Sequence, residues 1–148
     1  MMQNPVKNSE CESCLRKLLI NEGFKLSLQR ASGETGVDIL ASKNNEDLHI
    51  EVIGYKKTGP ARAKDFYEIF FRAVSRLNNG AQNCVIALPK QFEVGLPARA
   101  GHHRVAWERI GEAFPELEIW LVDVDEASYK KTSWVYWLGK FRGSQDLS

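Results

Sequence analysis

The sequence lacks several features that would assign it to a class at once. No stretch approaches the roughly 20 consecutive apolar residues of a membrane-spanning helix, and residues 1–10 lack the apolar run of a secretory signal peptide. The net charge is only +1, so no general electrostatic field attracts the chain to nucleic acid. We expect a protein without membrane segments, and any basic surface on it must be local.

Cysteine is also scarce, with Cys11, Cys14 and Cys84 as the three examples. An odd number favours a reducing compartment, so we expect a cytoplasmic protein. Cys11 and Cys14 form a CxxC, the spacing of half a zinc site or a redox pair. No second CxxC completes a zinc site, and the pair lies inside a helical pattern. We therefore interpret these two thiols as small apolar residues on one helix face.

The length and composition indicate one globular domain. The chain has 148 residues, of which 43% are hydrophobic and 26% are charged, as is usual for a domain that buries its own core. We therefore predict a single domain over residues 1–148, with flexible ends at 1–8 and 143–148.

The spacing of the apolar residues predicts alternating helices and strands. We expect a helix over 9–22, strands over 24–28, 37–42 and 48–55, a helix over 66–77, a strand over 84–88, a loop over 90–103, a helix over 102–114 with Ala106, Ile110, Ala113 and Phe114 inward, a strand over 118–124, and an apolar strand or short helix over 134–138. This order predicts an α/β fold with a mixed sheet and helices on both faces.

Two carboxylates interrupt apolar strand segments. Asp38 lies among Val37 and Ile39, and Glu51 lies between the apolar residues of the next strand. A turn at Asn44-Asn45 places Asp38 opposite Glu51 with their Cβ atoms roughly 5 Å apart. Paired carboxylates repel, and a divalent cation such as Mg²⁺ removes the repulsion. The alternative is that both carboxylates face water at strand ends.

These residues carry a resemblance to a known family. The motif GVDI (36–39) followed by IEV (50–52) resembles the PD-(D/E)XK, or restriction-endonuclease-like, nucleases, and is closest to archaeal Holliday junction resolvases and their relatives. Gly23-Phe24 matches a family strand, Glu12 a glutamate on the first helix, and Ser32 a loop serine. The resemblance implies a mixed β-sheet flanked by helices, an αβββαβ core with a C-terminal αβ extension, and a divalent-metal-dependent endonuclease.

One position departs from the family pattern. The family has a lysine two residues after the glutamate, where this chain has Ile53. The resemblance implies that this lysine activates the attacking water and stabilises the phosphate. Either another basic group replaces it, with Lys56 as the nearest candidate and Lys25, Arg30 and Lys57 as others, or the module binds nucleic acid or a partner protein without cleavage.

The resemblance also assigns roles to individual residues. Asp38, Glu51 and the backbone carbonyl of Val52 are the expected ligands of Mg²⁺ or Mn²⁺. Glu12 is expected to hold a second metal or its water shell. Its alternative is structural, because Ser9 and Glu12 have the spacing of a helix capping box.

A basic stretch follows the candidate site. Between residues 56 and 76 lie Lys56, Lys57, Arg62, Lys64, Arg72 and Arg76, with two acidic residues among them. Together with Ser32, these residues are candidates for contacting DNA, including branched DNA. The alternative is the solvated face of an amphipathic helix. Further along, His102-His103 is more typical of a helix start than of a metal site, since adjacent residues diverge on a helix.

An aromatic segment lies near the C-terminus. Trp134, Tyr136 and Trp137 could stack on bases, but such residues more often belong to a core or to a dimer interface. Members of the family are often dimers, so the resemblance implies a possible homodimer, which this apolar segment would suit. An unrelated α/β enzyme stays open as a third function, since a fold does not determine a function.

Overall fold

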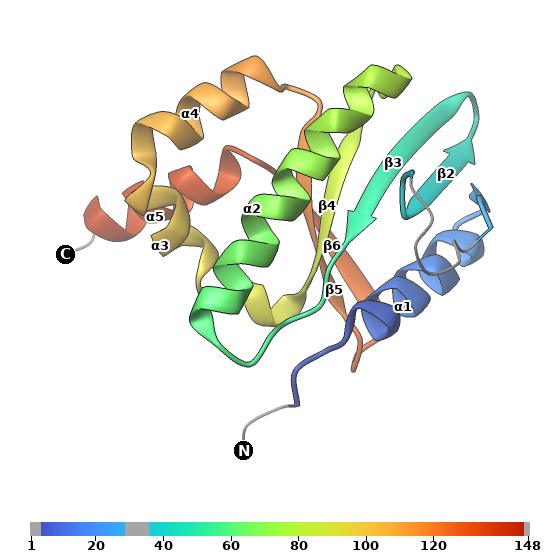
Figure 1. Ribbon diagram of the computed structural model, residues 1–148, viewed down its shortest axis with the longest axis horizontal. Helices are drawn as coiled ribbons and strands as arrows, with labels where there is room; N and C mark the ends of the chain where they lie inside the picture. The colour runs from blue at the N-terminus through green and yellow to red at the C-terminus, as the bar shows by residue number, and fades with distance from the viewer. Residues whose placement is uncertain (1–3, 29–35, 147–148) are drawn as a thin grey trace.

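The computed structural model describes residues 4–28 and 36–146, which form one six-stranded sheet covered by helices on both faces (Figure 1). The strands are β1 (Lys25–Leu26), β2 (Ile39–Lys43), β3 (Glu46–Val52), β4 (Cys84–Pro89), β5 (Leu117–Asp123) and β6 (Ser128–Ser133), in that order across the sheet. The helices are α1 (Asn8–Asn21), α2 (Gly59–Ser75), α3 (Leu96–His102), α4 (Arg104–Ala113) and α5 (Tyr136–Asp146), with short 3-10 helices η1 (Arg76–Asn79) and η2 (Lys90–Phe92). The predicted α/β class is confirmed.

The β2–β3 hairpin has the predicted turn. Asn44 and Asn45 have φ angles of 50° and 65°, the left-handed values that a two-residue hairpin turn requires and that asparagine tolerates. The strands pair antiparallel with Ile39 opposite Ile50. Extending this register by one residue brings Asp38 opposite Glu51, as the sequence predicts.

The centre of the sheet is parallel and buried. β3 pairs with β4 and β4 with β5 in parallel, while the pairs toward both edges are antiparallel. Every residue of β4 is buried, as expected for a strand covered on both faces. The helix α2 makes the crossover from β3 to β4, and the segment with α3 and α4 makes the one from β4 to β5. The predicted mixed sheet with helices on both faces is confirmed.

Two apolar clusters lie on opposite faces of the sheet. One packs beneath α1 and includes Cys11, Leu15 and Leu19. The other packs beneath α2 to α5 and includes Phe66 and Trp107 (Figure 1). No helix among the described residues is long and apolar enough to cross a bilayer.

Stacked tryptophans hold the second cluster together. The rings of Trp107 and Trp134 lie 3.8 Å apart, and each indole nitrogen donates a hydrogen bond to the backbone carbonyl of the other residue. The ring of Phe66 stacks against both indoles. Trp134 and Trp137 are buried within the single chain, so neither is available to stack on bases or to form a dimer interface. The homodimer stays a prediction, and these two tryptophans do not provide its interface.

The thiols of the CxxC belong to α1. Cys11 is fully buried, and burial raises the pKa of its thiol to about 12. Burial, as the largest cause, also raises the pKa of Cys14. Both groups are therefore protonated at neutral pH, which agrees with their interpretation as small apolar residues.

Several predicted elements differ from the structure. The segment 90–103 is not a loop, because η2 and α3 occupy most of it, with Pro97 in the first turn of α3 where proline is tolerated. The edge strand β6 is polar and its sequence pattern did not predict a strand. In α4 the buried residue is Trp107, whereas Ala106 and Ala113 are exposed.

The ends of the chain also differ from expectation. α1 begins at Asn8, and the Glu10 carboxylate accepts a hydrogen bond from the Lys7 amide, so the capping box predicted for Ser9 and Glu12 is wrong. The strand predicted over 24–28 has only two paired residues. At the other end, α5 continues to Asp146.

Candidate active site

The carboxylates of Asp38 and Glu51 lie side by side beneath α2. The Val52 amide donates a hydrogen bond of 2.8 Å to Asp38 Oδ2, and the Asp38 amide donates one of 3.3 Å to Glu51 Oε2. The Asp38 side chain is 12% exposed and that of Glu51 is 1% exposed. Backbone amides on both strands of the hairpin therefore fix the two carboxylates at one position, with Glu51 inside and Asp38 toward the surface.

Two guanidinium groups face these carboxylates. Arg72 Nη2 lies 3.1 Å from Asp38 Oδ2 and 3.6 Å from Glu51 Oε2, and Arg76 Nε lies 3.4 Å from Glu51 Oε1. Arg72 and Arg76 are four residues apart, so they project from the same side of the helical segment formed by α2 and η1. Arg72 is 37% exposed and Arg76 is less so. The centre therefore contains two carboxyl groups and two guanidinium groups, and Arg72 is the more exposed of the two arginines.

The Glu51 carboxyl is poised to change its protonation state near neutrality. Burial, followed by the charge of Asp38, raises its pKa to about 7, although Arg72 and Arg76 act in the opposite direction. Among the described residues, none donates a hydrogen bond to Glu51 Oε1. Arg76 Nε, 3.4 Å away, is the ionic partner of this oxygen without forming a hydrogen bond to it, so the oxygen keeps capacity for a further positively charged ligand.

His49, which no sequence motif singles out, lies in β3 on the same strand as Glu51. It precedes Glu51 by two residues in β3, so both side chains project from the same face of the strand. His49 is buried, and its Nδ1 has no hydrogen-bond partner among the described residues. Burial lowers its pKa, and Arg76 contributes in the same direction, so the ring is neutral at neutral pH. Its position two residues before Glu51 in a strand is the sequence feature that indicates the shared face.

The two carboxylates meet the minimum requirement for a magnesium ion. Mg²⁺ is commonly held by one or two carboxylates, with water and phosphate oxygens completing its octahedron. Asp38 and Glu51 supply two such groups, and Glu51 Oε1 is ion-paired with Arg76 but accepts no hydrogen bond. Within residues 4–28 and 36–146, no three His, Cys, Asp or Glu side chains are close enough to form a metal cage. The donor set therefore fits an ion that keeps most of its other ligands from water or substrate.

Glu12 reaches this centre only indirectly. Its carboxylate accepts a 2.8 Å hydrogen bond from Arg16 Nε, one turn later in α1. Arg16 in turn donates to the backbone carbonyls of Ser27 and Asp38. Glu12 is thus part of a chain of contacts that holds α1 against the start of β2.

The lysines suggested as replacements for the motif lysine lie elsewhere. Lys56 and Lys57 are exposed after β3 and line a cavity of about 1030 Å³ between that loop and the start of α1. The Lys56 backbone carbonyl accepts a hydrogen bond from Arg62. Lys25 is exposed on the edge strand β1. Arg30 and Ser32 lie outside the described residues.

Ile53 itself is buried in the cluster beneath α2, so its side chain belongs to the core. The cations nearest the carboxylates come from the helical segment that covers them. The sequence pattern predicts that Arg72 and Arg76 contact nucleic acid, and the structure places both guanidinium groups against the carboxylates. Phe66, Ile69 and Ala73 define the buried stripe of α2, and positions 72 and 76 flank that stripe. This helical spacing was the signal that the arginines approach the sheet.

Comparison of the chain with models of known protein families, with curated proteins and with solved structures finds no match. Its activity must therefore be inferred from the chemistry of its own side chains.

Proposed function

We propose that this protein is a divalent-metal-dependent endonuclease of the restriction-endonuclease-like kind, in which Arg72 takes the place of the motif lysine. The observation that carries the proposal is the pair of adjacent carboxylates, Asp38 and Glu51, with a partly exposed guanidinium 3.1 and 3.6 Å away. The chain order from α1 to β4, which is αβββαβ, is also the core order that the resemblance implies.

The ligands of the metal would be Asp38, Glu51 and the backbone carbonyl of Val52. When bound, Mg²⁺ or Mn²⁺ supplies a polarised phosphate oxygen and a water of lowered pKa. The hydrogen bond from the Val52 amide keeps the Asp38 carboxylate oriented. Attack of water oxygen on phosphorus breaks one phosphodiester P–O bond and leaves one phosphate and one hydroxyl end.

Arg72 would stabilise the negative charge that grows on the phosphoryl oxygens. A guanidinium presents several N–H donors in a fixed plane, which suits phosphate oxygens. Arg72 is the more exposed of the two arginines, so a modest rotation moves its nitrogens from the carboxylates to a phosphate at the surface. Arg76 remains on Glu51 Oε1 and positions that carboxylate.

A second function is supported by the charge of the same centre. If both carboxylates are ionised, the two guanidinium groups cancel their charge, which lowers the attraction for a divalent cation. In that case the module binds nucleic acid without cleaving it, and Arg72 stabilises the fold instead.

The test is incubation of the purified protein with linear and branched DNA in the presence of Mg²⁺ or Mn²⁺. We expect cleavage by the unchanged protein and its loss in Asp38→Ala and Arg72→Ala. Lys25→Ala is the matched control, because Lys25 is exposed on an edge strand. Cleavage that survives Asp38→Ala would come from a contaminant or a different site. No cleavage, together with no Mg²⁺ or Mn²⁺ binding by calorimetry, would favour the non-cleaving module.

A further inference from the structure

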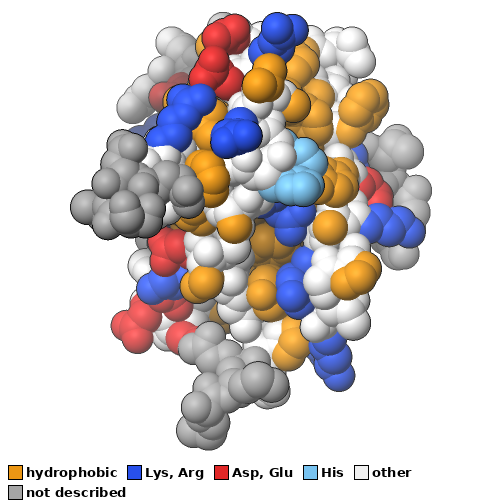
Figure 2. All heavy atoms as spheres, turned by 90° about the vertical axis from the view of Figure 1, so that its left-hand side faces the viewer, with side chains coloured by type: hydrophobic (Ala, Val, Ile, Leu, Met, Phe, Trp, Pro, Cys, Tyr) orange, Lys and Arg blue, Asp and Glu red, His pale blue; other side chains and the backbone are white. Residues whose placement is uncertain are grey.

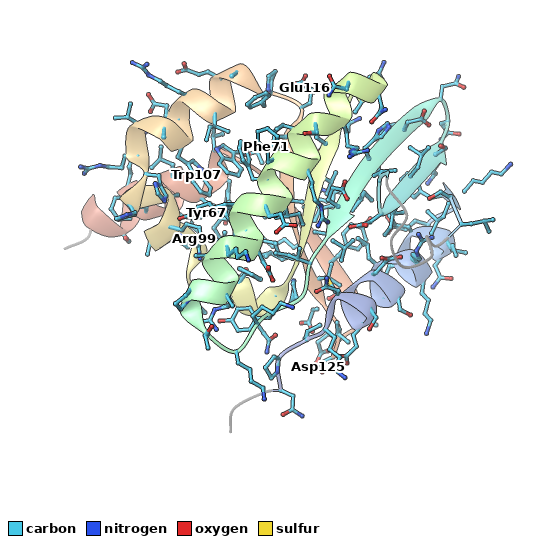
Figure 3. All side chains as sticks on the ribbon, in the orientation of Figure 1. Tyr67, Phe71, Arg99, Trp107, Glu116 and Asp125 are labelled. Carbon is cyan, nitrogen blue, oxygen red and sulfur yellow. The ribbon has the colours of Figure 1, made fainter. Side chains whose placement is uncertain are left out.

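The outward face of α2 carries two exposed aromatic rings. Tyr67 is 48% exposed and Phe71 is 69% exposed, and their spacing of four residues places them one turn apart on the same face. The inward face of the helix, with Phe66 and Ile69, already provides the packing against the sheet. Figure 3 shows Tyr67 beside α2 with Phe71 further along the helix. Tyr67 contacts Phe66 and His103 through its ring, whereas packing within the fold does not account for the ring of Phe71.

Basic side chains surround the rings. The Arg99 guanidinium carbon lies 5.0 Å from the ring centre of Phe66 and 5.7 Å from that of Tyr67, and Figure 3 shows Arg99 close to Tyr67. The Tyr67 hydroxyl lies 3.0 Å from His103 Nε2. Lys64, one turn earlier in α2, is exposed. We call Lys64, Tyr67, Phe71, Arg99 and His103 the aromatic surface.

The charge of this surface favours an anion. Lys64 and Arg99 have no carboxylate partner among the described residues, and Glu68 is the exposed acid on the same part of α2. Figure 2 shows the side of the molecule where α3 to α5 lie. Blue basic side chains and orange hydrophobic side chains surround the pale-blue histidine atoms on this side. Two cations, Lys64 and Arg99, thus lie beside the exposed rings of Tyr67 and Phe71, with Glu68 as the exposed acid among them.

The aromatic surface and the candidate active site adjoin on α2, with the exposed Glu68 one turn before Arg72. Phe71 directly precedes Arg72, whose guanidinium contacts Asp38 and Glu51. Consecutive residues on a helix point about 100° apart, so α2 presents a ring outward and a guanidinium toward the carboxylates at the same level. A strand of nucleic acid that places a phosphate near Arg72 would bring its neighbouring bases over Phe71 and Tyr67.

We propose that the aromatic surface binds the unpaired bases of single-stranded nucleic acid, with Phe71 as a stacking ring and Lys64 and Arg99 as phosphate contacts. This inference rests on the proposed function and specifies its substrate as an unpaired strand or a single-stranded region of a branched molecule. Exposed aromatic rings in a basic groove or face are typical of single-strand binding, because every base has a face that can stack. In a duplex those faces are already covered by neighbouring bases.

The test measures binding without cleavage. Fluorescence anisotropy follows a labelled oligothymidylate of about 12 nucleotides, a length within the usual single-strand site range, in EDTA and at low salt. We expect Phe71→Ala and Phe71→Leu to weaken binding roughly tenfold, and Phe71→Trp, which keeps an aromatic ring, to bind as tightly as the unchanged protein. Phe71→Leu matters most, because it keeps an apolar side chain and removes only the ring. Val94→Ala is the matched control, since Val94 is also exposed but lines a cavity with Asp123 and Glu126.

Two further measurements decide between occupants. The same oligonucleotide annealed to its complement should show little change between the unchanged protein and Phe71→Leu, whereas Lys64→Ala should lower the salt dependence of single-strand binding by about one unit of slope. Equal affinity of Phe71→Leu and unchanged protein for the single strand would overturn the proposal. So would a concentration-dependent dimer that Phe71→Ala dissociates, because a second copy would then be the occupant.

The outcomes for this surface and for the nuclease are separable. Single-strand binding that depends on Phe71, in a protein that cleaves nothing with Mg²⁺ or Mn²⁺, would support the surface and refute the nuclease. Cleavage that depends on Asp38, together with single-strand binding that does not depend on Phe71, would support the nuclease and refute the surface.

Discussion

The substitution Glu51→Gln should make the protein less sensitive to pH, because Glu51 is a buried acid whose ionisation opposes folding. Its pKa is about 7 in the folded protein and 4.5 as an ordinary glutamate. Between pH 4.5 and about pH 7 the folded chain therefore binds more protons than the unfolded chain. The free energy of unfolding falls as pH rises through this range. At about 1.4 kcal/mol per tenfold change in the proton equilibrium, the loss between pH 5 and pH 8 is about 2 to 3 kcal/mol.

Glutamine has nearly the same shape and no charge to lose. Its amide would face Arg72 and Arg76, which has a cost, but that cost does not depend on pH and cancels when two pH values are compared. The difference in unfolding free energy between Glu51→Gln and the unchanged protein should therefore rise by about 2 to 3 kcal/mol from pH 5 to pH 8. For a domain of this size, that corresponds to about 5 to 10 °C in melting temperature.

The assay is urea unfolding followed by the fluorescence of the four tryptophans, repeated at pH 5, 6, 7 and 8 without added metal. Glu112→Gln is the matched control, because that carboxylate is exposed on α4, and its difference from the unchanged protein should stay nearly constant with pH. A flat difference for Glu51→Gln over the same range would show that Glu51 is already ionised at pH 5. The explanation of the site as a strained acid that a cation relieves would then fail.

Three further predictions follow from other contacts. Arg72→Ala should bind Mg²⁺ or Mn²⁺ more tightly than the unchanged protein by calorimetry, because the guanidinium no longer competes for the carboxylates, and weaker binding would contradict this. Trp134→Ala should lower the unfolding free energy by about 3 to 5 kcal/mol, since the stacked ring and the hydrogen bond from its indole nitrogen to the Trp107 carbonyl are lost; a loss below about 1 kcal/mol in urea unfolding would show that the ring contributes little. Asn45→Gly should raise the melting temperature slightly or leave it unchanged, because glycine adopts the φ of 65° without the strain of a side chain, and a clear decrease by calorimetric scanning would argue against the turn.

The sequence predicted the hairpin well because its determinants are local. Asn44-Asn45 set the turn, and the alternation of apolar residues set which side of each strand is buried. Once the turn was located, the position of Asp38 opposite Glu51 followed from pairing geometry. The buried β4 was equally clear, since a short apolar run between polar segments suits few other structures.

The partners of the carboxylates were harder to predict because they depend on tertiary packing. Whether Arg72 and Arg76 face water or the sheet is decided by the rotation of α2 about its own axis, and that rotation is fixed by what packs on each side of Phe66. The strand β6 was missed because an edge strand is stabilised by backbone pairing with β5 and needs no apolar pattern of its own. The burial of Trp107 was not predicted, because the neighbouring Ala106 fits the inward face of α4 equally well from the apolar spacing alone.

The reciprocal hydrogen bonds between Trp107 and Trp134 make the C-terminal part of the chain a structural requirement of the whole. Phe66, in the middle of α2, has its ring stacked on both indoles, so the helix that carries Arg72 is supported by residues from α4 and from the segment before α5. A chain shortened after β4 would expose that ring and release the helix. We therefore expect that the αβββαβ core does not fold on its own, and that residues 4–28 and 36–146 unfold as one cooperative unit.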